Sequence, residues 1–154
     1  MTWSLRLKNG DIEKNGSQLA KVKHESKAIQ DLRSQLLYKM GINDLHPEYG
    51  SLLNGGVTPE GTVHESLIGT DDKEAAKLLI RSEINRIIGD YQNTQFARAK
   101  RDKMAYGKAT LTRREAIVGI SNITVDDSLD SIYIKITLVT GSKELNTIEL
   151  TVSD

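Results

Sequence analysis

The chain has 154 residues, of which 38% are hydrophobic and 27% are charged, a balance typical of one folded domain with a polar surface. Basic and acidic residues number 21 each, so the overall charge indicates no anionic partner. The absence of cysteine excludes disulfides, thiolate metal sites and cysteine nucleophiles. No apolar run approaches about 18 residues, so we expect no membrane partner. Residues 1–6 lack the apolar centre of a signal peptide, which predicts that the protein is made in a cytoplasm.

The first part of the chain predicts a β hairpin or arm over residues 1–22. Residues 3–8 alternate between apolar and polar side chains, as a half-buried strand does. Asn9-Gly10 and Asn15-Gly16 are both turn signals of the hairpin type. Trp3 is the only tryptophan, and we expect it to anchor the arm in the core.

Apolar residues recur at three- and four-residue steps across residues 25–40, which predicts an amphipathic helix. Gly41 stands where a left-handed residue can end that helix. Residues 42–69 hold both prolines of the chain and Asn54-Gly55-Gly56, so we expect a long loop there. Loops of this length in compact domains are usually functional or disordered.

A second helix is predicted to begin near Asp71, because Asp71 and Glu74 have the spacing of a capping box. Apolar residues follow at helical spacing as far as Tyr91, with Gly89 as a candidate break or bend. Residues 92–106 have helical propensity but a weak apolar pattern, so the sequence leaves open whether they continue this helix. Together, residues 23–110 form the predicted helical part.

Residues 111–154 predict three antiparallel strands. An apolar stretch over residues 117–125 has an irregular step at Ser121-Asn122, which indicates a β-bulge. Residues 132–138 and 148–152 alternate strictly between apolar and polar side chains. Such a meander has one apolar face, and the two helices are the elements available to cover it. The sequence therefore predicts a single α+β domain, residues 1–154, with an antiparallel C-terminal meander packed against two main helices and an N-terminal β arm.

Several short motifs stand in a recognisable order along this chain. They are residues 5–11, the helix end at residues 36–41, His46-Pro47-Glu48-Tyr49-Gly50, the apolar helix of residues 75–88, and the strands of residues 132–139 and 148–152. This order resembles the baseplate wedge family of contractile phage tails and related injection machines, whose members are also called sheath initiators or tail lysozyme-like proteins. The family's Glu-Pro-Arg triplet before the first C-terminal strand is replaced here by residues 113–117, in which only Glu115 matches.

The resemblance implies a structural subunit of the virion, located in the tail baseplate. Such a subunit joins the baseplate to the tail tube and initiates the sheath by offering an open strand edge to sheath subunits. The implied partners are other baseplate wedge proteins, tube subunits and sheath subunits, with six copies of the chain per tail. We expect no catalytic residue, cofactor or metal.

Contacts with neighbouring subunits are predicted in three regions: the loop around residues 47–53, the basic stretch of residues 98–114 and the C-terminal edge formed by the last two strands. In the basic stretch, seven cationic side chains oppose only Asp102. We also expect that proline at position 148 would block strand pairing with a neighbour. The predicted contact residues are Pro47, Glu48, Tyr49, Gly50, Arg98, Arg101, Arg113, Arg114, Glu115, Ile132, Ile134, Ile136, Ile148, Leu150 and Val152.

Two alternatives from other functional classes stay open. A peptidoglycan-degrading enzyme would need two carboxylates about 5–10 Å apart beside aromatic side chains, and Glu48 next to Tyr49 is the nearest local candidate. A nucleic-acid-binding protein would use the basic stretch on phosphates, although Tyr106 is the single aromatic residue within it. The three His-Glu neighbours match no metal-ligand spacing.

Overall fold

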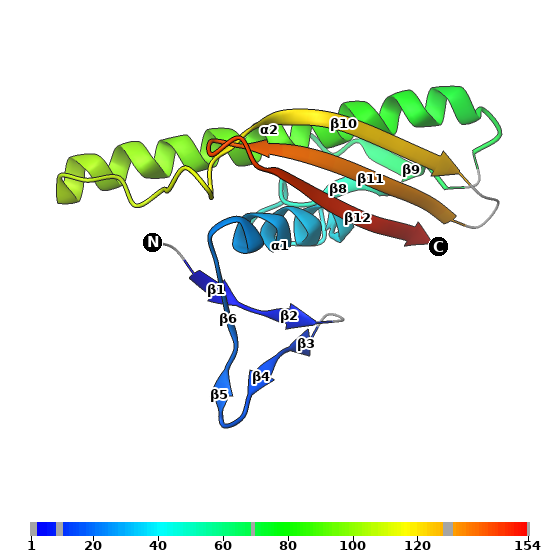
Figure 1. Cartoon of the computed structure of the whole chain (residues 1–154). Helices are drawn as coiled ribbons and strands as arrows, with labels where there is room; N and C mark the ends of the chain where they lie inside the picture. Colours follow the sequence, from blue (N-terminus) through cyan, green and yellow to red (C-terminus); the bar gives the residue numbers. More distant parts are fainter. Residues whose placement is uncertain (1–2, 9–10, 69, 128–130, 154) are drawn as a thin grey trace.

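The α+β fold expected from the sequence is present in the computed structural model, which describes residues 3–8, 11–68, 70–127 and 131–153 (Figure 1). The predicted turn at Asn9-Gly10 and the side chain of Trp3 lie outside the described parts. The elements beyond the arm are α1 (His24–Leu37), β7 (Lys39–Met40), β8 (Ser51–Val57), β9 (Val63–Ser66), α2 (Lys73–Tyr106), β10 (Ile117–Asp127), β11 (Ser131–Thr140) and β12 (Leu145–Ser153).

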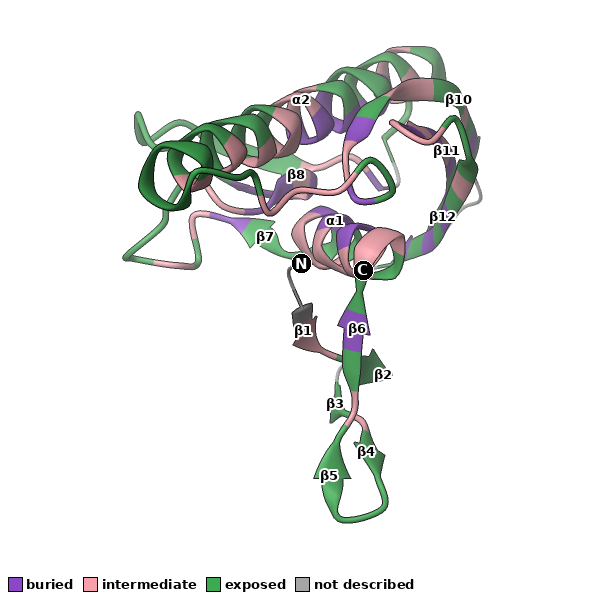
Figure 2. Ribbon diagram, turned by 60° about the vertical axis from the view of Figure 1, so that its left-hand side comes forward, coloured by how far each residue is buried: buried purple, intermediate pink, exposed green. Residues whose placement is uncertain are grey.

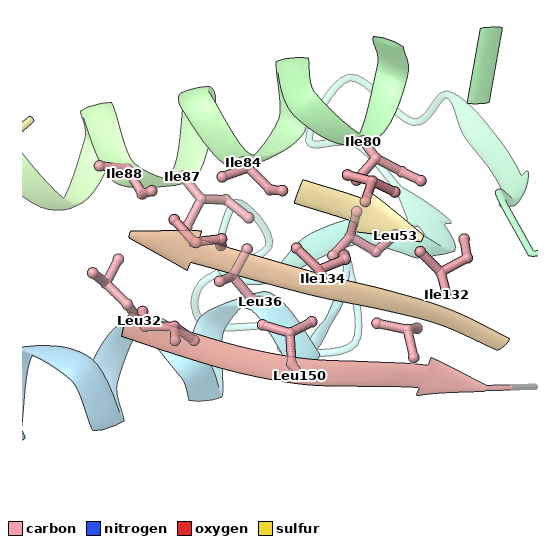
Figure 3. Packing of buried hydrophobic residues seen from close by; sticks show 14 of the residues in the cluster. Leu32, Leu36, Leu53, Ile80, Ile84, Ile87, Ile88, Ile132, Ile134 and Leu150 are labelled. Carbon is pink, nitrogen blue, oxygen red and sulfur yellow. The ribbon is translucent and has the colours of Figure 1, made fainter. Parts of the chain in front are cut away.

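The core lies between the C-terminal sheet and the two helices. The sheet has the order β10-β11-β12 and is antiparallel throughout, as the alternating pattern predicts. Its register shifts between Ile117 and Gly119 and again between Ile120 and Asn122, which places a bulge where the sequence indicated one. One face of this sheet meets α1 and α2 in a single apolar cluster (Figure 3), whose members include Leu32, Leu36, Ile80, Ile84, Ile87, Ile88, Ile132, Ile134, Ile136, Leu138, Ile148, Leu150 and Val152.

The predicted loop over residues 42–69 is wrong in its second half, because β8 and β9 form an antiparallel pair there and β7 joins β8 in a second sheet. The glycines that suggested a loop belong to β8. Gly56 has a φ of 149°, and a Cβ at that position would lie 2.8 Å from the carbonyl oxygen of Met40. The strand therefore requires glycine because a neighbouring backbone approaches it closely.

The first helix is shorter than the periodicity predicted. It ends at Leu37, and Gly41 follows β7 instead of capping the helix. The amide of Ser51 donates to the carbonyl oxygen of Tyr38 at 2.7 Å, which draws the chain after Leu37 out of the helix and into the sheet. Met40 is still buried, but from a strand.

The second helix is a single element of 34 residues, so residues 92–106 continue it and Gly89 does not end it. Its N-cap is Asp72 and not Asp71, since the Asp72 side chain accepts a hydrogen bond from the amide of Ala75 at 3.0 Å. At 1.5 Å per residue the helix is about 50 Å long. Its buried side chains all lie between Ala76 and Ile88, and none of residues 93–106 is buried (Figure 2).

The N-terminal arm is built from three short antiparallel pairs that meet at one point. The pairs are β1 (Trp3–Leu5) with β6 (Lys21–Lys23), β2 (Leu7–Lys8) with β3 (Asp11–Ile12), and β4 (Lys14–Asn15) with β5 (Gln18–Leu19). Where they meet, backbone hydrogen bonds of 2.8–2.9 Å join Arg6 to Ala20, Glu13 to Arg6 and Ala20 to Glu13. The predicted arm is therefore confirmed over residues 3–8 and 11–22, in a more branched form than a simple hairpin (Figure 1).

Candidate protein-interaction site

The strand β12 forms one edge of the C-terminal sheet. Within the described residues it pairs with β11 alone, whereas β11 lies between two neighbours and has no open edge. Of the two strands that the sequence offered as an open edge, only β12 can serve. In Figure 1, the C-terminal part of β12 extends past the end of α1.

The turn before β12 determines which of its backbone amides and carbonyls point toward β11 and which point outward. The amide of Thr140 donates to the carbonyl oxygen of Glu144 at 3.0 Å, and pairs along an antiparallel ladder alternate between bonded and non-bonded. Thr140 and Glu144 thus form a bonded pair, and every second pair of the register after it is bonded as well. The backbone amides and carbonyls of Ile148, Leu150 and Val152 therefore face β11. The amides and carbonyls that face away from the sheet belong to Leu145, Thr147, Glu149, Thr151 and Ser153.

The predicted residues on these strands thus have a different role from the one expected. The side chains of Ile132, Ile134, Ile136, Ile148, Leu150 and Val152 are all buried in the core, so none can contact a partner directly. Proline at position 148 would remove an amide that faces β11 as well as a core side chain. The outward-facing backbone belongs to Leu145 and to four polar residues of β12, which periodicity alone does not distinguish.

The opposite edge of the sheet, at β10, is less suited to pairing. Two bulges interrupt its register within the first six residues, and Val118 and Asp126 are exposed along it. Bulges and charged residues are common ways to keep an edge strand from pairing with other chains. In contrast, β12 is nine residues long, has an unbroken register and contains neither proline nor lysine. Its charged residue, Glu149, is paired with Lys135 at 3.0 Å.

The predicted turn at residues 47–50 is half surface and half internal. Pro47 and Glu48 are exposed, whereas Tyr49 packs edge-on against Tyr38 with 5.5 Å between ring centroids. Burial and the nearby negative charge of Asp31 raise the pKa of the Tyr49 hydroxyl. Gly50 is buried with a φ of 113°, and a Cβ there would lie 2.6 Å from the carbonyl oxygen of Tyr38. Gly50 therefore shapes the turn and is not itself a contact residue.

An ion pair between buried Glu83 and partly exposed Arg86 holds this turn against α2. Glu83 accepts from the amide of Leu52 at 2.8 Å and from the Arg86 guanidinium at 2.7 and 2.9 Å. Arg86 also donates to the carbonyl oxygen of Gly50 at 3.0 Å and to Asp90 at 3.0 Å. The hydrogen bond with Glu83 is the largest cause of a raised pKa at Arg86. Apolar periodicity does not reveal this pair; its signal in the sequence is an acid and a base three residues apart beside the apolar stripe.

The predicted contact residues of the basic stretch, residues 98–114, and its neighbour Glu115 are also partly exposed and partly internal. Arg98 and Arg101 are exposed on the part of α2 that follows its buried half, and Arg113 and Arg114 are exposed in the turn before β10. Glu115 is only 2% exposed, and its carboxylate accepts from the amide and hydroxyl of Thr112 at 3.1 and 3.0 Å. Glu115 therefore stabilises an internal turn and cannot serve as the surface contact expected from the sequence.

A broad groove of about 1200 Å³ lies between the arm, α1, the turn of residues 46–49 and the middle of α2; we call it the arm groove. Gln30 of α1 fixes its arm side, because its amide accepts from the backbone amide of Leu7 at 2.9 Å and donates to the carbonyl oxygen of Leu5 at 2.7 Å. Leu7 and Ile12 present exposed apolar side chains to the groove. The charged residues that line it are Asp31, Glu48 and Asp90.

These three carboxylates do not have the setting that glycoside hydrolysis requires. Asp31 is paired with Lys27, and Asp90 is paired with Arg86. The side chain of Glu48 is 65% exposed and lies 3.5 Å from His46, so it is not enclosed by apolar side chains. In the described part of the chain, no group of three potential metal ligands occurs. Neither described helix is both long and apolar enough to cross a membrane.

Comparison with known proteins adds no relative to this picture. The chain matches no protein-family model, no curated protein and no solved structure.

Proposed function

We propose that this chain is a structural subunit of a contractile-tail baseplate, and that it starts sheath assembly by pairing β12 with a strand of the first sheath subunit. The resemblance of its sequence motifs to the baseplate wedge family supports the proposal. The α+β architecture, with the meander at the C-terminal end, agrees with what that resemblance implies.

The observation that carries the proposal is the difference between the two edges of the sheet. An unpaired edge strand presents backbone donors and acceptors to any extended chain, so soluble proteins usually shorten it, bend it or place charges along it. The β10 edge is bent in this way, but β12 is long and regular. An edge left in that state is suited to accept a strand from another subunit.

Thr151 provides the test, because its side chain is exposed and its amide faces away from β11. Thr151→Pro removes one outward donor and keeps the amides that pair with β11, so we expect the monomer to stay folded at a cost of about 1 kcal/mol or more for fixing φ in an extended strand. Tails that lack the wild-type chain should then assemble a baseplate and tube with this variant but no sheath, as seen by electron microscopy.

Thr151→Ala is the matched control, since it removes the same side chain and keeps the amide. We expect tails with this variant to carry normal sheath. If Thr151→Pro tails also carry normal sheath while the variant is folded, β12 is not the pairing edge and the proposal fails.

A further inference from the structure

The projecting half of α2, residues 93–106, has little contact with the rest of the molecule. None of its side chains is buried, and Figure 2 shows it mostly exposed at the end away from the sheet. Its contacts with the segment that follows include two hydrogen bonds between Gln95 and the backbones of Glu115 and Ile117, at 2.7 and 3.0 Å, and one between Asp102 and the hydroxyl of Thr110. Isolated helices of this length are marginal in water, so a covered face would stabilise this one.

One face of the projecting half has the chemistry of a contact surface. Phe96 and Met104 are 54% and 80% exposed, although both are large apolar side chains. Lys100 and Lys103 are exposed, and steps of three and four residues place them on the same face as Phe96 and Met104. The face therefore combines two apolar side chains with two positive charges.

The arm groove has the complementary chemistry. Its exposed apolar side chains, Leu7 and Ile12, come from the arm. On the other side, Glu48 and Asp90 keep 65% and 56% of their side chains exposed, so both remain open to a further cation. No lysine or arginine lines the groove among the residues that the structure describes.

We propose that the projecting half of α2 of one copy docks in the arm groove of a second copy, with Lys100 and Lys103 facing Glu48 and Asp90. Apolar contact between Phe96 and Met104 and the arm residues Leu7 and Ile12 completes the contact. Asn93 and Thr94 line the groove of their own copy, but Phe96, Lys100, Lys103 and Met104 do not, so the contact is heterologous and can repeat from copy to copy. The inference stands on the groove and the helix, independently of β12.

The test is sedimentation of the full chain, with Thr151→Pro present throughout to remove pairing through β12. We expect self-association within concentrations up to about 1 mM, where even weak contacts become visible. The association should weaken as salt rises from about 50 to about 500 mM, because exposed charges are then screened. Lys100→Glu with Lys103→Glu, and separately Glu48→Lys, should each weaken it by about tenfold or more.

A charge swap makes the test specific. A chain that carries Lys100→Glu, Lys103→Glu and Glu48→Lys together should recover part of the lost affinity, because position 48 again faces an opposite charge while Asp90 still faces a like one. Arg81→Glu is the matched control: Arg81 is exposed on the half of α2 that packs on the core, and its reversal should leave association unchanged.

Three results would overturn the inference. The first is a chain that stays monomeric at every concentration. If that monomer also retards a DNA duplex in a gel, residues 93–106 bind nucleic acid and not a second copy. The second is an association that Arg81→Glu weakens as much as the lysine reversals. The third is the absence of recovery in the swapped chain while its thermal unfolding remains that of the wild type. None of these would affect the sheath test of β12, which uses different variants and a different readout.

Discussion

Glu83 is a charged residue inside an otherwise apolar stripe, and its surroundings explain why it is tolerated there. Its carboxylate joins the amide of Leu52 to the guanidinium of Arg86, and Arg86 in turn holds the carbonyl oxygen of Gly50. Every one of these groups is wholly or partly removed from water, so each would be costly to leave unpaired. The pair thereby fixes the start of β8 and the base of the turn that carries Glu48.

We expect Glu83→Ala to lower the free energy of unfolding by about 3 kcal/mol, because it leaves the Leu52 amide and the Arg86 guanidinium without their partner. Chemical denaturation followed by circular dichroism measures this change. Glu74→Ala is the control: it removes an exposed carboxylate from the first turn of the same helix, which should cost under about 1 kcal/mol. Equal effects of the two substitutions would show that the buried pair contributes no more than a surface one.

At the scale of elements, β8 shows why glycines can mislead a reading of the sequence. Its Asn54-Gly55-Gly56 segment has the composition of a loop, but Gly55 and Gly56 are strand residues packed against the backbones of β9 and β7. A Cβ at Gly55 would lie 2.8 Å from the carbonyl oxygen of His64. The glycines therefore allow two neighbouring strands to come close, and they do not loosen the chain.

Gly56→Ala should destabilise the protein by about 2–3 kcal/mol, since the new methyl group meets the Met40 carbonyl and alanine disfavours a positive φ. Gly119→Ala in β10 is the matched control, because no atom lies within 4 Å of its Cβ position and its φ is ordinary. Its effect should stay within about 0.5 kcal/mol. A comparable loss in both variants, measured by thermal unfolding, would mean that close packing at β8 is not the reason for its glycines.

The elements that could be predicted from the sequence are those whose side chains alternate between core and solvent. The strands β11 and β12 and the first half of α2 follow this rule, and the core residues among them are those expected. What could not be predicted depends on the backbone of a distant segment. The end of α1 is set by the bond between Tyr38 and Ser51, and the outward residues of β12 are set by the turn at Thr140.

The candidate site was located by region but not by residue. Glu115 and Gly50 fall within the predicted regions, yet both are internal. The arm groove unites residues from four separate segments, and periodicity carries no information on how such segments meet. The exposed face of residues 93–106 was visible only as a weak apolar pattern within a basic stretch.

At the scale of the whole molecule, the partly buried hydroxyl of Tyr91 links stability to alkaline pH. Tyr91 of α2 reaches α1, where its hydroxyl donates to Asp31 at 3.4 Å. Burial is the largest cause of its raised pKa, followed by the negative charge of Asp31. A tyrosine whose pKa is raised by folding binds its proton more tightly in the folded state. Its stabilising contribution is therefore complete below the unfolded value of about 10 and is lost as pH rises above it.

The free energy of unfolding should fall by about 1 kcal/mol per pH unit above pH 10 through this residue. In Tyr91→Phe this part of the decline should disappear, whereas Tyr106→Phe, which alters an exposed ring, should keep it. Urea unfolding at pH 9 and pH 11 gives the comparison. The same slope in all three proteins would place the alkaline sensitivity elsewhere.

The regular edge of β12 also has a consequence for the free polypeptide before it meets a partner. A row of open amides accepts a strand of almost any sequence, including the same strand of another molecule or a stretch of a nascent chain. Backbone hydrogen bonds do not distinguish one partner sequence from another. Correct pairing therefore depends on when and where the chain is synthesised and on a low concentration of free chain. Overproduction in isolation should therefore favour insoluble aggregates, and synthesis together with a proper acceptor should suppress them.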